Sequence, residues 1–187
     1  LSPKEVGGIA AYCSQSVTNS YNTAKITIEG PDASHLSHVG GIIGLQCEWD
    51  TGGTSINCYN TGDMTGPSMA GGITGLAIFR STDDITRNCY NTGNISGMYR
   101  TGGIVGKSQS HADAGGRIIN CYNLGNVTSQ DHVGGISGTT YGAIISCFNT
   151  GNIKATGQYA SGITAYIYSY SDHPIAIEKC WNSGTID

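Results

Sequence analysis

Cysteine is the residue type with the most chemical potential in this chain, and five of its seven copies occupy one position of a repeating pattern. Their spacings of 26 to 33 residues match no zinc-binding pattern such as C-x2-C. In register on adjacent parallel strands, their Cβ atoms would run side by side, which suits a disulfide poorly. We therefore expect a ladder of small, buried side chains. It consists of Cys58, Cys89, Cys121, Cys147 and Cys180.

Cys13 and Cys47 differ from these five. They follow a glycine motif at nearly matching places in the first two repeats, so a disulfide between them is left open.

The five histidines are the next candidates for chemistry, but their surroundings do not suit catalysis. None lies near a Ser or Cys in an elbow motif, and no H-x3-H pair occurs. A polysaccharide lyase or hydrolase would need converging carboxylates or a basic residue on one face. The nine Lys and Arg are instead spread thinly over the repeats. We expect no enzymatic activity, no catalytic residue and no metal centre at His35, His38, His111, His132 and His173.

Acidic and aromatic side chains gather in extra segments of five or six residues, which four repeats carry after a glycine motif. In a stack of repeats such segments project from one edge, where repeat proteins usually place recognition. Carboxylates beside aromatic rings would suit a basic partner or Ca²⁺, the one cofactor considered. The alternative is that aspartate is simply common in turns. The candidate ligand-binding residues are Trp49, Asp50, Phe79, Asp83, Asp84, His111, Asp113, Tyr170 and Asp172.

Two recurring motifs must position all of these residues. G-G-I-x-G occupies residues 40–44, 71–75, 102–106 and 134–138, with weaker copies at 7–11 and 161–165. C-Y-N-T-G and close variants occupy 58–62, 89–93, 121–125, 147–151 and 180–184, after a weaker copy at 20–24. A period near thirty residues indicates stacked repeats within a single domain, 1–187. The repeats span residues 6–38, 39–69, 70–100, 101–132, 133–159 and 160–187.

The shortest repeat leaves room for three short strands and three turns, but not for helices. Glycine interrupts every few residues, and no 3.6-residue period appears. Parallel strands joined by crossovers of one hand predict an all-β, right-handed parallel β-solenoid (β-helix). It should have about six coils and a roughly triangular cross-section.

Each motif position should form a column of like side chains along the solenoid. Isoleucines of the first motif and apolar residues at 26, 64, 95, 127, 153 and 186 should face inward. The glycine pairs suggest corners with positive φ. The asparagines of the second motif should bond turn backbone or the asparagine one coil away.

Two further columns could face solvent. The aromatic column at 21, 59, 90, 122, 148 and 181 would point outward under strict alternation, as a sugar or peptide platform. Packing at a corner is favoured, because Phe148 and Trp181 lack the tyrosine hydroxyl. A threonine column that includes Thr61 suggests an ice-binding face, although Leu124 and Ser183 break it.

Composition argues against two classes of partner. With a formal net charge of -4 and scattered basic residues, the chain has no basic stripe for nucleic acid or an anionic membrane. No apolar run approaches the roughly 18 residues that a membrane helix needs. The chain opens almost directly on a repeat and stops inside a second-motif copy, so we expect a fragment of a longer protein.

The paired elements G-G-I-x-G and C-Y-N-T-G-N-I resemble the GLUG repeat of large bacterial surface and secreted proteins, including the immunoglobulin A-specific metallopeptidases. The resemblance covers nearly the whole chain and is best at 71–97 and 102–128. The first repeat departs from the pattern, with Ala10 and Ala11 for x-Gly and Ser20 for Cys. The resemblance implies an extracellular, non-catalytic, β-rich segment beside another functional domain. The metallopeptidase motif H-E-x-x-H does not occur in this sequence, so that activity is not implied.

These features predict a non-catalytic β-solenoid module of a bacterial extracellular or cell-surface protein, serving as a stalk or adhesive display surface. The alternative is a carbohydrate-binding module that uses exposed aromatics and the acidic loop edge. The expected partner is a host glycan or protein at a cell surface, or none for a pure spacer. Because open solenoid ends expose strand edges, end-to-end self-association is also expected.

Overall fold

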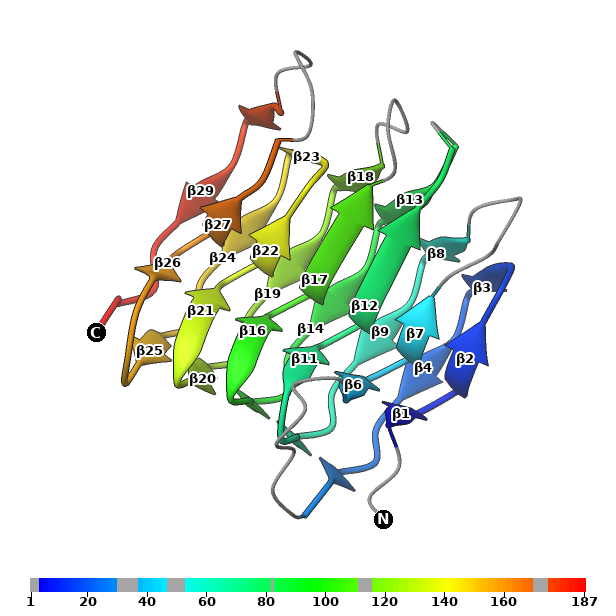
Figure 1. The fold of residues 1–187 in the computed structure, drawn as a ribbon, viewed down its shortest axis with the longest axis horizontal. Helices are drawn as coiled ribbons and strands as arrows, with labels where there is room; N and C mark the ends of the chain where they lie inside the picture. Colours follow the sequence, from blue (N-terminus) through cyan, green and yellow to red (C-terminus); the bar gives the residue numbers. More distant parts are fainter. Residues whose placement is uncertain (1–3, 30–36, 47–52, 82, 111–115, 170–174) are drawn as a thin grey trace.

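The computed structural model describes residues 4–29, 37–46, 53–81, 83–110, 116–169 and 175–187. Within these ranges the chain forms parallel β-strands and no helix, so no described helix could cross a membrane. In Figure 1 the strands of the near side run upward, those of the far side return, and the chain advances from the N- to the C-terminus as a right-handed solenoid. The predicted parallel β-solenoid is confirmed.

Equivalent strands of successive coils pair in register and form five parallel sheets among the described residues. The first sheet ends at the glycine pair of each coil and contains β1 (Glu5–Gly7), β6 (His38–Gly40), β11 (Met69–Gly71), β16 (Tyr99–Gly102), β21 (Asp131–Gly134) and β26 (Ala160–Ser161). The second follows the glycine pair and contains β2 (Ala10–Cys13), β7 (Ile43–Gln46), β12 (Thr74–Phe79), β17 (Val105–Ser110), β22 (Ser137–Thr140) and β27 (Thr164–Ile167).

The other three sheets make up the far side in Figure 1. The third contains β3 (Ser16–Thr18), β8 (Thr54–Ile56), β13 (Ile85–Arg87), β18 (Arg117–Ile119), β23 (Ala143–Ile145) and β28 (Ile177–Glu178). The fourth contains β4 (Tyr21–Asn22), β9 (Tyr59–Asn60), β14 (Tyr90–Asn91), β19 (Tyr122–Asn123), β24 (Phe148–Asn149) and β29 (Trp181–Asn182). The fifth contains β5 (Ile26–Thr27), β10 (Met64–Thr65), β15 (Ile95–Ser96), β20 (Val127–Ser129) and β25 (Ile153–Ala155), which a bridge to Ile186 continues.

The interior holds two apolar clusters separated by a column of amides. The larger contains the motif isoleucines, such as Ile73 and Ile104, together with four buried thiols. The smaller joins residues of the first and fifth sheets, such as Val39 and Met64. Between them stand the buried asparagines of the fourth sheet. The isoleucine, cysteine, Met64 and asparagine columns were expected inside or in a structural role, whereas the column of Val39 in the first sheet was not foreseen from the sequence.

The glycine pairs serve close approach, not the positive φ that the sequence suggested. A Cβ at Gly103 would lie 2.1 Å from the carbonyl oxygen of Gly135 and 2.4 Å from Cγ of Asn123, so the amide column packs directly on glycine backbone. Positive φ occurs instead just before the cysteine position, for example at Asn57 (56°) and Asn88 (54°). Asparagine enters this region more readily than most residues. This turn and the glycine pair divide the expected three strands of each coil into five.

Candidate functional site

The long inserts connect strands of the second sheet to strands of the third, in the connections β7–β8, β12–β13, β17–β18 and β27–β28. The strands that flank all four inserts therefore meet at the same edge of the solenoid. Six of the candidate ligand-binding residues lie outside the described residues: Trp49, Asp50, His111, Asp113, Tyr170 and Asp172.

The three candidates that are described do not form an exposed ridge. Asp83 is exposed, but Phe79, at the end of β12, is 1% exposed and packs in the larger core cluster. The assignment of Phe79 to a ligand-binding surface is therefore wrong, because its lengthened strand carries the ring into the core. Asp84 is also buried, and its Oδ2 accepts the N–H groups of Arg80 at 2.5 Å and Ser81 at 2.9 Å. That assignment is wrong as well, since the carboxylate closes a turn.

The cysteine column is a row of free thiols. Cys58, Cys89, Cys121 and Cys147 are buried, and Cys180 is partly buried at the end of the row. The Cys121 thiol donates to the carbonyl oxygen of Ile119 at 3.3 Å. Burial, reinforced by neighbouring thiols, raises the pKa of Cys121 well above its usual value, so it is neutral and a poor nucleophile.

Cys13, the other cysteine that the structure describes, is also free. Cys47 lies outside the described residues.

The aromatic column points outward and stacks along the solenoid. From Tyr21 to Trp181, neighbouring ring centroids lie 4.6 to 5.0 Å apart with planes 2° to 4° from parallel. Every inner ring therefore has an aromatic neighbour on both faces, and only ring edges and hydroxyls meet solvent. A sugar ring that stacks on an aromatic side chain needs a free face. The geometry thus supports a packing role along the column.

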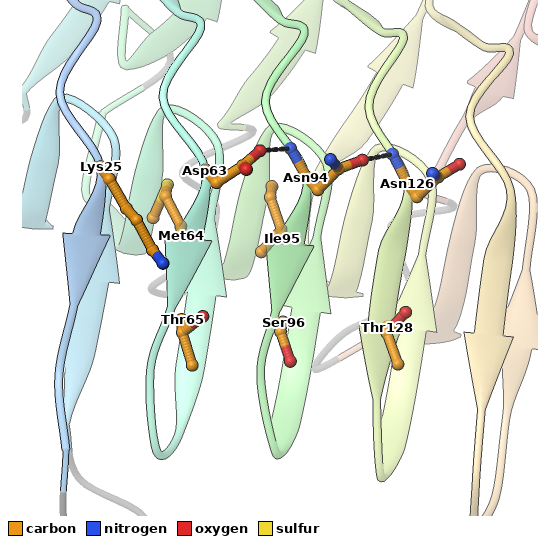
Figure 2. Close-up of a pocket in the computed structure, with 9 residues that line it drawn as sticks. All are labelled: Lys25, Asp63, Met64, Thr65, Asn94, Ile95, Ser96, Asn126 and Thr128. Carbon is orange, nitrogen blue, oxygen red and sulfur yellow. Dashed lines mark hydrogen bonds between the residues drawn. The ribbon is translucent and has the colours of Figure 1, made fainter.

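An open groove of about 400 Å³ crosses the fifth sheet (Figure 2). Two parallel rows of polar side chains border it in the figure, one from the turn before each strand and one from the strand itself. Between the rows, Met64 and Ile95 contribute mainly backbone, because each is only 1% exposed. The lining residues are Lys25, Asp63, Met64, Thr65, Asn94, Ile95, Ser96, Asn126 and Thr128.

The turn row is fixed by hydrogen bonds between coils. Oδ1 of Asp63 accepts the backbone N–H of Asn94 at 2.8 Å, and Oδ1 of Asn94 accepts that of Asn126 at 3.1 Å. The amide nitrogens of Asn94 and Asn126 remain as donors beside the groove, opposite hydroxyls such as that of Ser96. The charged lining groups, Lys25 and Asp63, have opposite signs. This chemistry suits a neutral ligand with many hydroxyl groups.

Sequence reasoning missed this groove, although a signal was present. In the first four strands of the fifth sheet, the inward apolar residue is followed by a hydroxyl residue, at 27, 65, 96 and 128. Two residues before each hydroxyl stands a polar side chain, at 25, 63, 94 and 126. The threonine column that includes Thr61 is distinct from this hydroxyl row. Leu124, which is 44% exposed, interrupts the threonine column in the middle of the solenoid.

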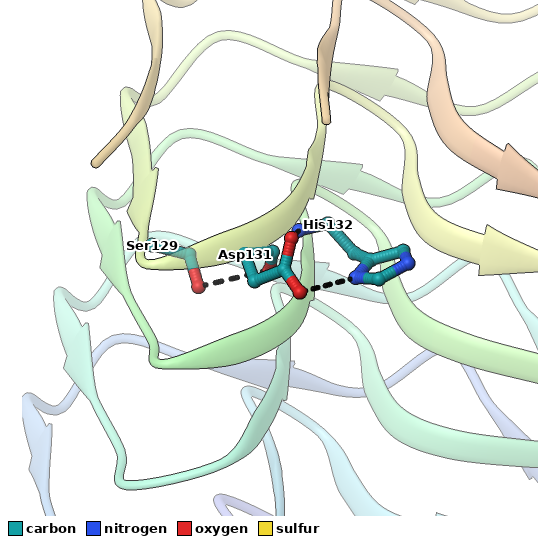
Figure 3. Close-up of polar contacts among 3 residues, drawn as sticks. All are labelled: Ser129, Asp131 and His132. Atoms are coloured by element: carbon teal, nitrogen blue, oxygen red, sulfur yellow. Dashed lines mark hydrogen bonds and ion pairs between the residues drawn. The ribbon is translucent and has the colours of Figure 1, made fainter. Parts of the chain in front are cut away.

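Ser129, Asp131 and His132 form a polar cluster that lacks the geometry of a nucleophilic triad (Figure 3). Oδ2 of Asp131 lies 3.0 Å from Nδ1 of His132. Ser129 instead donates to the backbone carbonyl of Asp131 at 3.4 Å, so the imidazole does not activate its hydroxyl. The imidazole packs near Tyr159 and Tyr166, with centroids 4.9 and 5.4 Å away. The cluster orients His132, a residue of strand β21 whose φ is 50°.

Among the described residues, no group of three or more His, Cys, Asp or Glu could hold a metal ion. Comparisons of the chain with family models, curated proteins and solved structures return no match. Any functional inference therefore comes from the columns, the shared insert edge and the groove.

Proposed function

We propose that this chain is a non-catalytic β-solenoid module of a bacterial extracellular or cell-surface protein, in which it serves as a stalk or adhesive display surface. The GLUG-like motifs support the bacterial surface setting. The observation that carries the spacer role is the unbroken aromatic stack, whose ring spacing stays between 4.6 and 5.0 Å from the first coil to the last.

Continuous ladders make a spacer whose length is set by coil number. Each added coil extends the stack by about 4.8 Å, the distance between hydrogen-bonded strands. Each stacked aromatic pair contributes on the order of 1 kcal/mol beyond burial. A repeat can be added or removed without disturbing the others, because each coil contacts chiefly its neighbours.

The test changes coil number. Removing residues 101–132 joins Arg100 to Val133, which already occupies the register position of Thr101. Inserting three further copies of the same segment should lengthen the rod by about 14 Å, since each coil adds about 4.8 Å. Small-angle scattering should show the change in maximum dimension, with β-type circular dichroism retained. Loss of folding, or a length that does not follow coil number, would contradict the spacer proposal.

The groove favours the alternative function, a carbohydrate-binding module. Asn94 and Asn126 repeat an amide in two neighbouring coils of the lining, and Thr65, Ser96 and Thr128 repeat a hydroxyl in three, so a linear polymer along the rod would meet like groups in successive coils. The binding surface would then differ from the stacked aromatics expected from sequence, whose faces are covered. The loop-edge residues Trp49 and Tyr170 remain a prediction.

The alternative is tested by affinity electrophoresis on galactomannan, xyloglucan and mixed-linkage glucan. Ser96→Lys places a long side chain in the groove, and Lys154 shows that this strand position accepts lysine. The matched control is Thr92→Lys, which adds the same charge at an exposed site outside the groove lining. Retardation lost only in Ser96→Lys supports the alternative. Absence of retardation on all three polymers, or equal behaviour of the two variants, counts against it.

A further inference from the structure

Two basic residues lie close together in the middle coils of the solenoid. Arg100 belongs to β16 and Lys107 to β17, the next strand, on the near side in Figure 1. Both are partly buried. A Cβ at Gly106 would lie 2.9 Å from the carbonyl oxygen of Arg100, so the backbone beside Lys107 packs directly on that of Arg100. Both strands have neighbours on either side in their sheets, which places the pair well inside the stack of coils.

Both basic side chains face away from the interior. Thr101 and Ser108, the residues that follow Arg100 and Lys107, are fully buried. Side chains alternate between the two faces of a strand, so the residue before each buried position points outward. The pair therefore lies on the outer surface of the first and second sheets.

The backbone of Arg100 has an unusual conformation. Its φ is 47°, a left-handed value that is unfavourable for a residue other than glycine, asparagine or aspartate. Met69, which precedes the register partner of Thr101 in the preceding coil, does not have a positive φ. Outliers of this kind gather at binding sites, where the surrounding structure holds them and they fix the direction of a side chain.

No described carboxylate forms an ion pair with Arg100 or Lys107. The ion pairs of the described residues involve histidines instead. Lys107 is held by neutral groups: its Nζ donates to Oε1 of Gln109 at 3.2 Å and lies 5.5 Å from the ring centroid of Tyr141. Burial, and then the positive charge of Arg100, lower the pKa of Lys107. An anion bound by both side chains would offset their repulsion.

A buried hydroxyl beside the pair also lacks a partner. Thr139 is in register with Lys107 in the next coil and is 2% exposed. Its Oγ1 has no hydrogen-bond partner among the described residues. A Cβ at Gly138 would lie 2.5 Å from the carbonyl carbon of Arg100, so the strand of Thr139 packs against β16 as well. Two cations without a carboxylate and one hydroxyl without a partner therefore lie on neighbouring strands.

We propose that Arg100 and Lys107 bind a carboxylate of an acidic polysaccharide, a polymer of uronic acids, on the outer face of the first and second sheets. Guanidinium and ammonium groups form charge-assisted hydrogen bonds with a carboxylate. The amide nitrogen of Gln109, whose oxygen accepts from Lys107, can donate to a sugar hydroxyl. Because the formal net charge of the chain is -4, long-range attraction does not draw in polyanions, and recognition depends on this local pair.

A polysaccharide fits this face better than an acidic peptide does. A peptide that adds a strand to a sheet uses the free backbone groups of an edge strand. β16 and β17 are paired on both sides, so neither offers such an edge. A sugar polymer needs only side-chain charges and hydrogen-bond donors, which this face supplies.

The inference names a ligand class for the display role proposed above and rests on that role. It concerns a different face from the groove of the fifth sheet, whose lining suits neutral polymers. The spacer test measures rod length against coil number and does not involve this pair. Failure to bind an acidic polymer would therefore overturn the inference and leave the relation between length and coil number intact.

The test measures binding to immobilised polygalacturonate and alginate, with neutral dextran, dextran sulfate and polyglutamate as comparison surfaces. A double variant, Arg100→Asn with Lys107→Leu, removes both charges. Asparagine tolerates the left-handed φ at position 100. Leucine already occupies the register position of Lys107 one coil earlier, as Leu76. If the double variant unfolds, Lys107→Thr replaces Lys107→Leu, because Thr139 occupies that position one coil later.

The matched control removes two exposed charges elsewhere, by Arg87→Ile with Lys154→Thr. Ile56 and Thr128 occupy these register positions one coil earlier, so the fold accepts both side chains. The two double variants have the same net charge. A difference between them therefore reports the position of the charges and not their number.

In biolayer interferometry at about 0.15 M salt, the unmodified chain and the control should bind both uronic acid polymers. Arg100→Asn with Lys107→Leu should bind about tenfold more weakly, because charge-assisted hydrogen bonds are lost. Circular dichroism checks that each variant folds. Four results would overturn the inference: no binding by the unmodified chain, equal weakening in the control, equal binding to polyglutamate, or stronger binding to dextran sulfate than to either uronic acid polymer.

Discussion

The interior amide of Asn91 makes three hydrogen bonds while fully buried. It donates to the carbonyl of Gly93 at 2.7 Å and to Oδ1 of Asn123 at 2.8 Å, and it accepts from Asn60 at 2.8 Å. Aspartate could not donate, and an apolar residue could neither donate nor accept. Asparagine at this position is therefore dictated by hydrogen bonding between coils as well as by the turn.

Asn91→Ala should lower the free energy of unfolding by about 3 kcal/mol. It removes the acceptor of one Asn60 N–H and the side-chain donors to Oδ1 of Asn123 and to the Gly93 carbonyl, all inside the rod. The matched control is Asn94→Ala on the surface. It loses the bond from the Asn126 N–H, which water can replace, and should cost about 1 kcal/mol. Urea titrations measure the free energy of unfolding of both variants, fitted with the same dependence of that free energy on urea concentration. Equal losses would mean that the inner ladder adds no stability beyond that of a surface turn.

At the scale of one coil, the bends decide which residues meet. The glycine pair lets the amide column touch backbone: a Cβ at Gly41 would lie 2.6 Å from Cγ of Asn60. On the far side, a left-handed residue such as Asn88 turns the chain just before Cys89. The bend at the glycine pair needs residues without a side chain. The bend before the cysteine needs a residue that tolerates positive φ.

Gly103→Ala should destabilise the rod by about 3 kcal/mol or more, since its methyl would overlap the carbonyl of Gly135 and the buried Asn123 side chain. Gly157→Ala is the control. It lies in an exposed turn, and its Cβ meets one atom closer than 3 Å, the Gln130 carbonyl oxygen at 2.6 Å. Thermal melting of the two variants should separate them by several degrees. A Gly103→Ala protein as stable as Gly157→Ala would show that the coils can move apart at this corner.

Columns could be predicted from the sequence, but bends could not. Repetition shows that Cys89 and Cys121 are equivalent, and equivalence alone stacks them in a parallel solenoid. Repetition does not show how the backbone turns between Gly72 and Ile73. The glycine pair was therefore predicted to adopt positive φ, whereas it serves close approach of the asparagine column. Phe79 and Asp84 were misplaced for a related cause. They lie in a non-repeating insert, where no column indicates the inward direction.

At the scale of the whole rod, equivalent backbone hydrogen bonds lie in coils with different numbers of neighbouring coils. The amide N–H of Ile9, Ile73 and Ile104 each donates to the isoleucine carbonyl of the following coil, at 3.1, 2.9 and 3.0 Å. The coil of Ile9 has one described neighbour, whereas the other two coils have neighbours on both sides. In a linear array, opening an end coil breaks one interface, and opening a central coil breaks two.

Hydrogen exchange should therefore be graded along the rod, although the three bonds are alike. The Ile73 and Ile104 amides should exchange at least tenfold more slowly than that of Ile9, corresponding to about 1.4 kcal/mol of additional opening free energy. The measurement is made at low protein concentration, where end contacts between copies are absent. Equal protection of all three amides at low concentration would mean that the six coils open as one cooperative unit and that the coils do not behave as a linear array.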